Sequence, residues 1–217
     1  YSISYIEGQL NDSILKERKL LITIAYKLLM DHHTYTLSDL ASQFHLSKSD
    51  VLDCVTRIQT WCEKFDVTIT LKRKQGIIID ASGSDLSNAV LHLNQLSSNE
   101  IKVEDLILQE LPQGHIQRIH HIIKKHIQAS ELQTSDNQVR QLLVHLILII
   151  KRTNSEELDW ESNPTSLAIA RQCIKDINQQ LGYQLTDETS QLFSFFISYH
   201  FNQFDLSFQQ LFIQSYI

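Results

Sequence analysis

Residues 47–80 read SKSDVLDCVTRIQTWCEKFDVTITLKRKQGIIID, and within this stretch the pattern changes from helical to extended. Ser47 and Asp50 form a helix-start signal, because an acid three residues after a serine can reach back to the free amides of the first turn. The next residues place apolar side chains on one helical face: Val51, Val55, Ile58 and Cys62. From Val67 onward apolar and polar residues alternate, as in a half-buried strand, and the last four residues can pair back. The stretch therefore predicts a helix followed by a β-hairpin.

Two helical segments precede this stretch. Residues 16–30 carry a wide apolar stripe at helical spacing, and Thr36 or Ser38 can cap a short helix that ends at Phe44. In the hairpin, Gly76 follows a charged turn at a position where glycine adopts a positive φ without steric cost. Helix, short helix, turn, helix and hairpin is the order of a winged helix-turn-helix.

The rest of the chain has helical periodicity. The helices expected after the hairpin cover residues 85–96, 103–111, 116–128, 136–152, 166–181 and 187–202. The 217 residues include only five Gly and two Pro, which favours long uninterrupted helices. The predicted fold class is mainly α: a winged helix-turn-helix of three helices plus a β-hairpin, followed by an all-α five-helix bundle.

The expected domain organisation follows the breaks between these segments. It comprises a linker from an upstream part over 1–13, the winged helix-turn-helix over 14–82, a connecting helix and linker over 83–99, the helical bundle over 100–203 and the start of a linker or further domain over 204–217. The chain begins at Tyr1 rather than Met and stops at Ile217 within an apolar-rich stretch. We therefore expect a fragment of a longer protein.

Charge is distributed unevenly along the chain, whose formal net charge is -6. Residues 16–80 contain ten Lys and Arg against eight Asp and Glu, whereas the remainder contains nine against seventeen. Only the first part is therefore a candidate for binding a polyanion, and it is weakly basic. We expect DNA binding by this fragment alone to be weak.

The candidate DNA contacts lie in two places. On the second helix of the motif they are Lys48, Ser49, Thr56 and Arg57. At the tip of the wing they are Lys72, Arg73 and Lys74. Leu52 and Asp53 do not suit a face that approaches phosphates, since a carboxylate is repelled there and an aliphatic chain gains little. A degenerate module used for spacing or dimerisation is the alternative.

No catalytic constellation, metal motif or membrane segment is evident in the sequence. Cys54, Cys62 and Cys173 form no CxxC pair, and the longest apolar run, residues 142–150, is far short of the ~20 residues that a membrane span needs. We expect a cytoplasmic, non-enzymatic protein with no membrane span, cofactor or metal. Four histidines of a basic segment, His115, His120, His121 and His126, could suggest a metal, but a solvated helix face is the favoured interpretation.

His145 lies in the middle of the apolar run LLVHLILII at 142–150. A lone histidine in such a run is usually a packed, hydrogen-bonded core residue. The alternative is a histidine at a domain surface or interface that accepts a phosphoryl group.

Several segments together resemble a known family. LLVHLILIIKR at 142–152 matches L-x-x-H-L/I-x-x-x-I-x-R, and LGYQLTDE at 181–188 and FISYHF at 196–201 follow in the family's order. The residues Gly76-Ile77-x-Ile79 with Leu86 and Ala89 are similar to the end of the activators' second winged helix. From about Ile14 to Phe201 the chain resembles regulators with a phosphotransferase-system regulation domain (PRD), of the BglG and mannitol-activator type.

This resemblance implies a transcription factor that is switched when sugar-transport phosphocarriers phosphorylate regulatory histidines, here His145 and His200. The implied partners are DNA, the phosphocarrier protein and sugar-specific transporter components, and a second copy bound through the helical domain. The expected function is a DNA-binding regulator, an activator, of carbohydrate-uptake genes. A phosphate adds about two negative charges to a helix surface, which can break or build such a dimer.

The sequence departs from the family pattern at three positions. Val144 stands where the family has an Asp before its first histidine, and Ser87 replaces an Arg. Counting without gaps from Leu185 places Phe196 at the second regulatory position, whereas the motif places His200 there, one helical turn further on.

Other functions remain open from the sequence. A dimerisation and interaction scaffold with a vestigial winged helix, no longer phosphorylated, is the main alternative. An RNA-binding antiterminator would need a small β-sheet domain in place of the winged helix. The sugar, the operon and the direction of the phosphorylation effect are not encoded in any motif.

Overall fold

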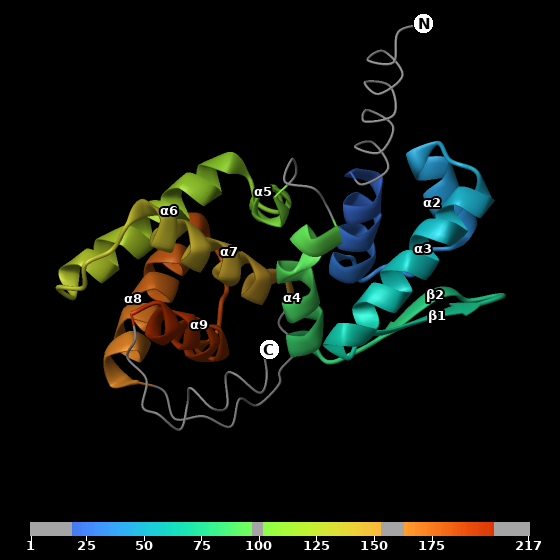
Figure 1. Cartoon of the computed structure of the whole chain (residues 1–217). Helices are drawn as coiled ribbons and strands as arrows, with labels where there is room; N and C mark the ends of the chain where they lie inside the picture. Colours follow the sequence, from blue (N-terminus) through green and yellow to red (C-terminus); the bar gives the residue numbers. More distant parts are fainter. Residues whose placement is uncertain (1–18, 97–101, 153–162, 202–217) are drawn as a thin grey trace, which may run out of the picture. The chain divides into compact units, whose positions relative to one another are not determined.

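The computed structural model describes residues 19–96, 102–152 and 163–201, and the segments predicted over 1–13 and 204–217 lie outside the described residues. The fold is mainly helical with one two-stranded antiparallel hairpin in its described part, which confirms the predicted class (Figure 1). The chain divides into two compact units, Tyr1–Asp105 and Leu106–Ile217.

The first unit contains the predicted order of helices and hairpin. After a helix over residues 19–30 come α2 (Leu37–Phe44), α3 (Lys48–Cys62), the 3-10 turn η1 (Glu63–Phe65), β1 (Thr68–Lys72), β2 (Gly76–Asp80), α4 (Gly83–Leu91) and the 3-10 turn η2 (Leu93–Leu96). The prediction of a single helix over 85–96 is wrong, because this segment forms two elements, α4 and η2. His92 leaves the helical conformation (φ -96°, ψ 3°), and the chain continues as the tighter η2.

Side-chain caps determine where the helices of this unit begin. Thr36, rather than Ser38, caps α2: its hydroxyl accepts from the Asp39 amide at 3.2 Å, and the Asp39 carboxylate accepts from the Thr36 amide at 2.8 Å. The same serine-to-acid spacing caps α3, where the Asp50 amide donates to the Ser47 hydroxyl at 3.1 Å. Because these caps are local in sequence, the starts of α2 and α3 could be predicted from the sequence.

The hairpin is held against α3 and against the segment before α2. In its register Thr70 pairs with Ile78, and the Gln59 side-chain amide of α3 donates to the Ile69 carbonyl at 2.9 Å. Gly76 has a φ of +89°, and a Cβ added there would lie 2.5 Å from the Tyr35 carbonyl oxygen. That same carbonyl accepts a hydrogen bond from the neighbouring Ile77 amide at 2.8 Å. Two independent constraints therefore require glycine at position 76: its backbone has a positive φ, and no space is left for a side chain.

The second unit is built from four long helices in its described part, preceded by a short one. In this part of the chain lie α5 (Val103–Leu108), α6 (Gln113–Ala129), α7 (Asp136–Arg152), α8 (Pro164–Leu181) and α9 (Asp187–His200). Helix α9 packs against α7 and α8, and α6 packs against the same two helices. The division between the units falls within α5, after Asp105. The Val103 amide of α5 donates to the Asn94 side chain at 2.8 Å, within the first unit.

The turn between α8 and α9 is fixed by side chains that bind backbone groups. Gly182 ends α8 with a φ of +72°. Asn178 then donates to the Leu185 carbonyl and accepts from the Leu185 amide, both at 2.9 Å. Arg171 and Asp187 form a two-pronged ion pair at 2.7 and 2.9 Å. These contacts set the position of α9 on α8. Helix α9 in turn carries part of the candidate functional site.

Candidate functional site

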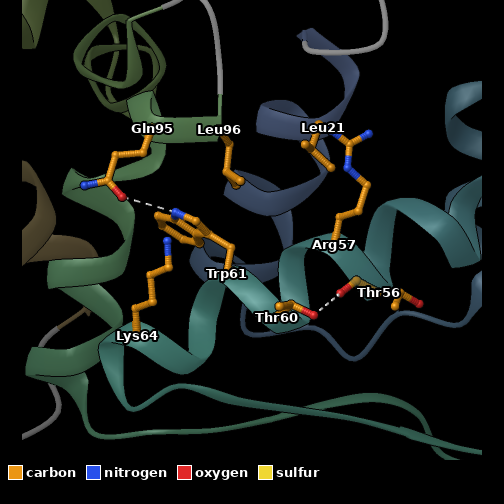
Figure 2. Close-up of a pocket in the computed structure, with 8 residues that line it drawn as sticks. All are labelled: Leu21, Thr56, Arg57, Thr60, Trp61, Lys64, Gln95 and Leu96. Carbon is orange, nitrogen blue, oxygen red and sulfur yellow. Dashed lines mark hydrogen bonds between the residues drawn. The ribbon is translucent and has the colours of Figure 1, made fainter.

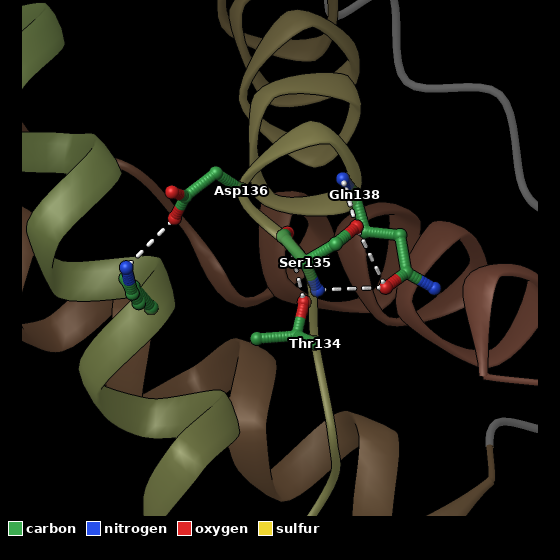
Figure 3. Close-up of polar contacts among 5 residues, drawn as sticks. Thr134, Ser135, Asp136 and Gln138 are labelled. Carbon is green, nitrogen blue, oxygen red and sulfur yellow. Dashed lines mark hydrogen bonds and ion pairs between the residues drawn. The ribbon is translucent and has the colours of Figure 1, made fainter.

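The start of α7 is fixed by polar contacts that also tie it to α6 (Figure 3). Ser135 and Gln138 cap the helix reciprocally: the Gln138 amide donates to the Ser135 hydroxyl at 3.2 Å, and the Ser135 amide donates to the Gln138 side-chain oxygen at 2.9 Å. Lys124 of α6 pairs with Asp136 at 2.7 Å. The cap and this ion pair hold the helix that presents His145.

Two side chains of α9, one helical turn apart, lie against His145 of α7. The Phe196 ring stacks on the imidazole, with centroids 4.0 Å apart and an interplanar angle of 13°. The centroid of the His200 ring is 5.8 Å from that of His145, at an interplanar angle of 51°. We call His145, Phe196 and His200 the histidine cluster. The structure brings together the two histidines singled out by the sequence, with Phe196 beside them.

The surroundings of the histidine cluster favour neutral imidazoles. Burial, with the nearby His200 charge as a smaller cause, lowers the pKa of His145 to about 3. Burial also lowers the pKa of His200 from its usual value of 6.5. Both residues are nevertheless half-buried rather than sealed from solvent. A neutral imidazole keeps a lone pair on one ring nitrogen, which is the form that attacks phosphorus.

One polar atom of the cluster has no partner. Among the described residues, the buried side-chain atoms that lack a hydrogen bond are Asn88 Oδ1, Ser198 Oγ and His200 Nε2. The nitrogens of His145 are not in this group. An unsatisfied buried polar atom costs about 1–3 kcal/mol, so an unpaired nitrogen in this position calls for an explanation.

The residue before His145 offers no carboxylate to orient the imidazole. Val144 is 2% exposed and belongs to the apolar interior. A carboxylate–histidine pair occurs elsewhere, between α6 and α8: His126 Nε2 lies 2.7 Å from an Asp176 oxygen that also pairs with Lys125 at 3.2 Å.

The α6 histidines make inter-helix contacts of their own. His115, at the start of α6, has its Nδ1 2.8 Å from the hydroxyl of Tyr183, which follows α8, and the His126 contact with Asp176 of α8 lies toward the other end of α6. Within the described ranges, no group of three or more His, Cys, Asp and Glu side chains could hold a metal ion.

The candidate DNA contacts of α3 do not form one uniform basic face. Lys48 and Ser49 are exposed at its start, together with Asp53 and with Leu52, which is 41% exposed. The Thr56 hydroxyl donates to the Leu52 carbonyl of its own helix at 2.8 Å, so its proton is committed within the helix. A threonine held in this way offers an oxygen acceptor to DNA rather than a donor to phosphate.

Arg57 lies on a different part of α3. It lines an open hollow of about 600 Å³ (Figure 2) whose other lining residues are Leu21, Thr56, Thr60, Trp61, Lys64, Gln95 and Leu96. The Trp61 indole donates to the Gln95 side chain at 3.3 Å across this hollow. The sequence analysis did not predict this hollow, because its lining comes from four elements, the helix over 19–30, α3, η1 and η2, that only folding brings together.

The wing presents the most compact basic group of the first unit. Lys72, Arg73 and Lys74 are all exposed at the tip of the hairpin. The turn is closed by a hydrogen bond from the Gln75 amide to the Lys72 carbonyl at 3.1 Å. Three cations on a tight turn suit a phosphate backbone more than they suit a base edge.

The sequence of this chain is similar to part of a known transcriptional regulator. No protein-family model matches the chain. The transcriptional regulator ManR of Bacillus subtilis (strain 168) is 21% identical to it over 142 residues, which cover 65% of this chain and 22% of the relative. The matched region thus corresponds to about a fifth of that regulator. Separately, none of the described helices is both long and apolar enough to cross a membrane.

Proposed function

We propose that this chain is part of a DNA-binding transcription regulator whose helical unit is controlled by phosphorylation of the histidine cluster. The observation that carries the proposal is the meeting of His145 and His200, which lie far apart in the sequence and 5.8 Å apart between ring centroids in the fold. The likeness to the regulator ManR and the winged helix-turn-helix order of the first unit support the same class. No enzymatic activity is part of the proposal.

The proposed switch is electrostatic. A phosphoryl group brings ~1.5–2 negative charges to a site between α7 and α9 whose imidazoles are neutral. Buried Val144 and the stacked Phe196 leave this site largely apolar. Charge introduced there costs solvation free energy unless the surface rearranges or a partner compensates it. We infer that this changes the association of two copies of the helical unit.

The proposed partners follow from the family that the sequence resembles. A phosphocarrier protein and sugar-specific transporter components are the proposed phosphoryl donors, and genes for carbohydrate uptake in a bacterial cytoplasm are the proposed targets. The proposed role in transcription is activation. In DNA binding, the proposed contacts are the wing residues with Lys48, Ser49, Thr56 and Arg57.

Phosphorylation of the intact chain by a phosphocarrier protein tests this function. With the carrier, its activating enzyme and phosphoenolpyruvate, we expect a mass increase of one phosphoryl group, located by mass spectrometry at His145 or His200. The His145→Ala/His200→Ala double variant is expected to lose it. His121→Ala, an exposed α6 histidine, is the matched control and is expected to keep it. If a competent control domain is labelled and this chain is not, the switch is refuted.

A second candidate function rests on one observation. Exposed Leu52 and Asp53 occupy the side of α3 that would approach DNA. They favour an interaction scaffold in which the winged helix no longer reads DNA. DNA binding with and without the basic wing separates the two functions.

A further inference from the structure

The two histidines of the cluster are not equivalent. The nitrogens of His145 are not among the buried atoms without a partner, whereas His200 Nε2 is buried and unpaired. We propose that His145 is the phosphoryl acceptor, and that His200 is a positioning residue whose imidazole binds the phosphoryl group by hydrogen bond and charge. The inference rests on the proposed function and adds to it a division of roles and a limit of one phosphoryl group per histidine cluster.

The Phe196 stack supports His145 as the acceptor. An imidazole lone pair lies in the plane of the ring, while Phe196 covers a face of the ring at 4.0 Å. Stacking therefore fixes the orientation of the ring without covering the direction in which a new N–P bond forms. Because burial keeps the imidazole neutral, no proton has to leave before attack.

The transfer balances without any further reagent. The lone pair of a His145 nitrogen forms the new N–P bond while the bond from phosphorus to the donor's leaving atom breaks and the leaving group keeps that electron pair. The proton on the other His145 nitrogen passes to the leaving group or to solvent. A phosphorylated carrier protein is the proposed donor class, and phosphoramidate, which releases ammonia, is a small donor of the same N–P chemistry.

The position of His200 explains its unpaired nitrogen. With ring centroids 5.8 Å apart, a phosphoryl group on His145 comes within reach of the His200 ring. Its oxygens supply the acceptor that Nε2 lacks, and its negative charge favours the imidazolium form of His200. A second phosphoryl group on His200 would place two dianions side by side in a half-buried site, where like charges repel strongly.

Labelling of the intact 217-residue chain with potassium phosphoramidate tests this division of roles. We expect peptide mass spectrometry at neutral pH to find a phosphoryl group on His145 and none on His200 of the same wild-type chain. The His145→Asn variant is expected to lose the label, and His200→Asn, which keeps a side-chain N–H donor, is expected to retain it at His145. In His200→Phe, which removes the donor, the label on His145 is expected to decay ~10-fold faster, because a charge-assisted hydrogen bond is lost.

A second measurement does not depend on a variant that must fold. Ring NMR signals of His200 are expected to titrate below pH 6.5 in the unmodified chain and above it after labelling; a purely structural His200 would not move in this way. Label on His200 in the His145→Asn variant at the rate seen for His145 in the wild-type chain, or label on both histidines of one cluster, overturns the division of roles and leaves the proposed function standing. If neither phosphoramidate nor the carrier labels any variant, the proposed function itself fails.

Discussion

At the scale of single residues, the chemistry of His145 is set by its neighbours rather than by a dedicated partner. Burial by α7 and α9 lowers its pKa to about 3, so the imidazole is neutral across the physiological pH range. The preceding residue is a buried valine, and Phe196 takes over the role of fixing the ring. Stacking on Phe196 thus orients the ring, as a hydrogen-bonded carboxylate does at many reactive histidines, whereas burial lowers the pKa that a carboxylate would raise.

This environment makes stability depend on pH with a definite sign. The pKa of His145 is lower in the folded chain than the value of about 6.5 expected for the unfolded chain, so the unfolded chain takes up the proton first. The contribution of His145 is therefore complete above pH 6.5 and is lost as the pH falls toward 3. Between pH 6 and pH 4 it is expected to lower the free energy of unfolding by at most about 1.4 kcal/mol per pH unit.

Urea unfolding of the wild-type chain and of His145→Phe at pH 7, 6, 5 and 4 measures this contribution. The variant keeps an aromatic ring against Phe196 but cannot be protonated, so its unfolding free energy is expected to fall less steeply with acid. His121→Phe, at an exposed position, is expected to follow the wild-type slope. Parallel pH profiles for all three proteins would contradict the assigned burial of His145.

At the scale of elements, the hairpin depends on a close approach between backbones. The segment before α2 brings the Tyr35 carbonyl against β2, where it accepts from the Ile77 amide and occupies the space of a Gly76 side chain. The wing is therefore built against the segment before α2 as well as against α3. Its orientation is set by the segment before α2, and with it the direction in which the basic tip points.

Gly76→Ala is expected to destabilise the first unit by more than about 2 kcal/mol. Positive φ alone costs about 1–2 kcal/mol in a residue with a Cβ, and the contact with the Tyr35 carbonyl adds to that. Gly182→Ala is the matched control in the second unit, since Gly182 has a φ of +72° but no atom within 4 Å of the added Cβ. It is expected to cost only the about 1–2 kcal/mol of the positive φ.

The two costs can be measured by urea unfolding in a Trp160→Phe background. Trp61 emission then reports the first unit, because it is the other of the two tryptophans in the chain. Far-UV circular dichroism of Gly182→Ala gives the control value. Equal losses for the two variants would show that the Tyr35 contact is not tight.

At the scale of the whole molecule, the balance of charge limits what the first unit can bind. The second unit carries eight Lys and Arg against eleven Asp and Glu, whereas residues 16–80 carry ten against eight and expose three cations, Lys72, Arg73 and Lys74, at the wing tip. Association with DNA through such a patch is largely electrostatic and weakens steeply with salt. Base-specific contacts from α3 would have to come from few side chains beside Leu52 and Asp53.

If the chain is part of a DNA-binding regulator as proposed, changing Lys72, Arg73 and Lys74 together to alanine in that regulator is expected to weaken its binding to operator DNA. If each cation meets a phosphate, the slope of log affinity against log salt is expected to fall by about 2–3, at ~0.9 per contact. Gel shifts or fluorescence anisotropy over a range of salt concentrations measure the affinity and its salt slope. Arg118→Ala with Lys175→Ala, exposed cations of the second unit, is the control. Unchanged affinity and slope in the wing variant would favour the scaffold function.

The sequence by itself determined the features that depend on near neighbours along the chain. The helix start after Ser47, the hairpin turn at Gly76 and the mainly helical class follow from caps, periodicity and turn residues, which act over a few residues. The sequence motifs also singled out His145 and His200 as the candidate phosphorylation sites.

Only the tertiary structure decided which side chains meet. Helical periodicity tells that one face of α7 is buried, but the helix that covers it depends on contacts between residues far apart in the chain. The stacking of Phe196 on His145, the unpaired nitrogen of His200 and the carbonyl of Tyr35 against Gly76 are all contacts of this kind. They arise from how α9 packs on α7 and how the segment before α2 packs on β2, and close packing fixes those positions where local pattern leaves them free.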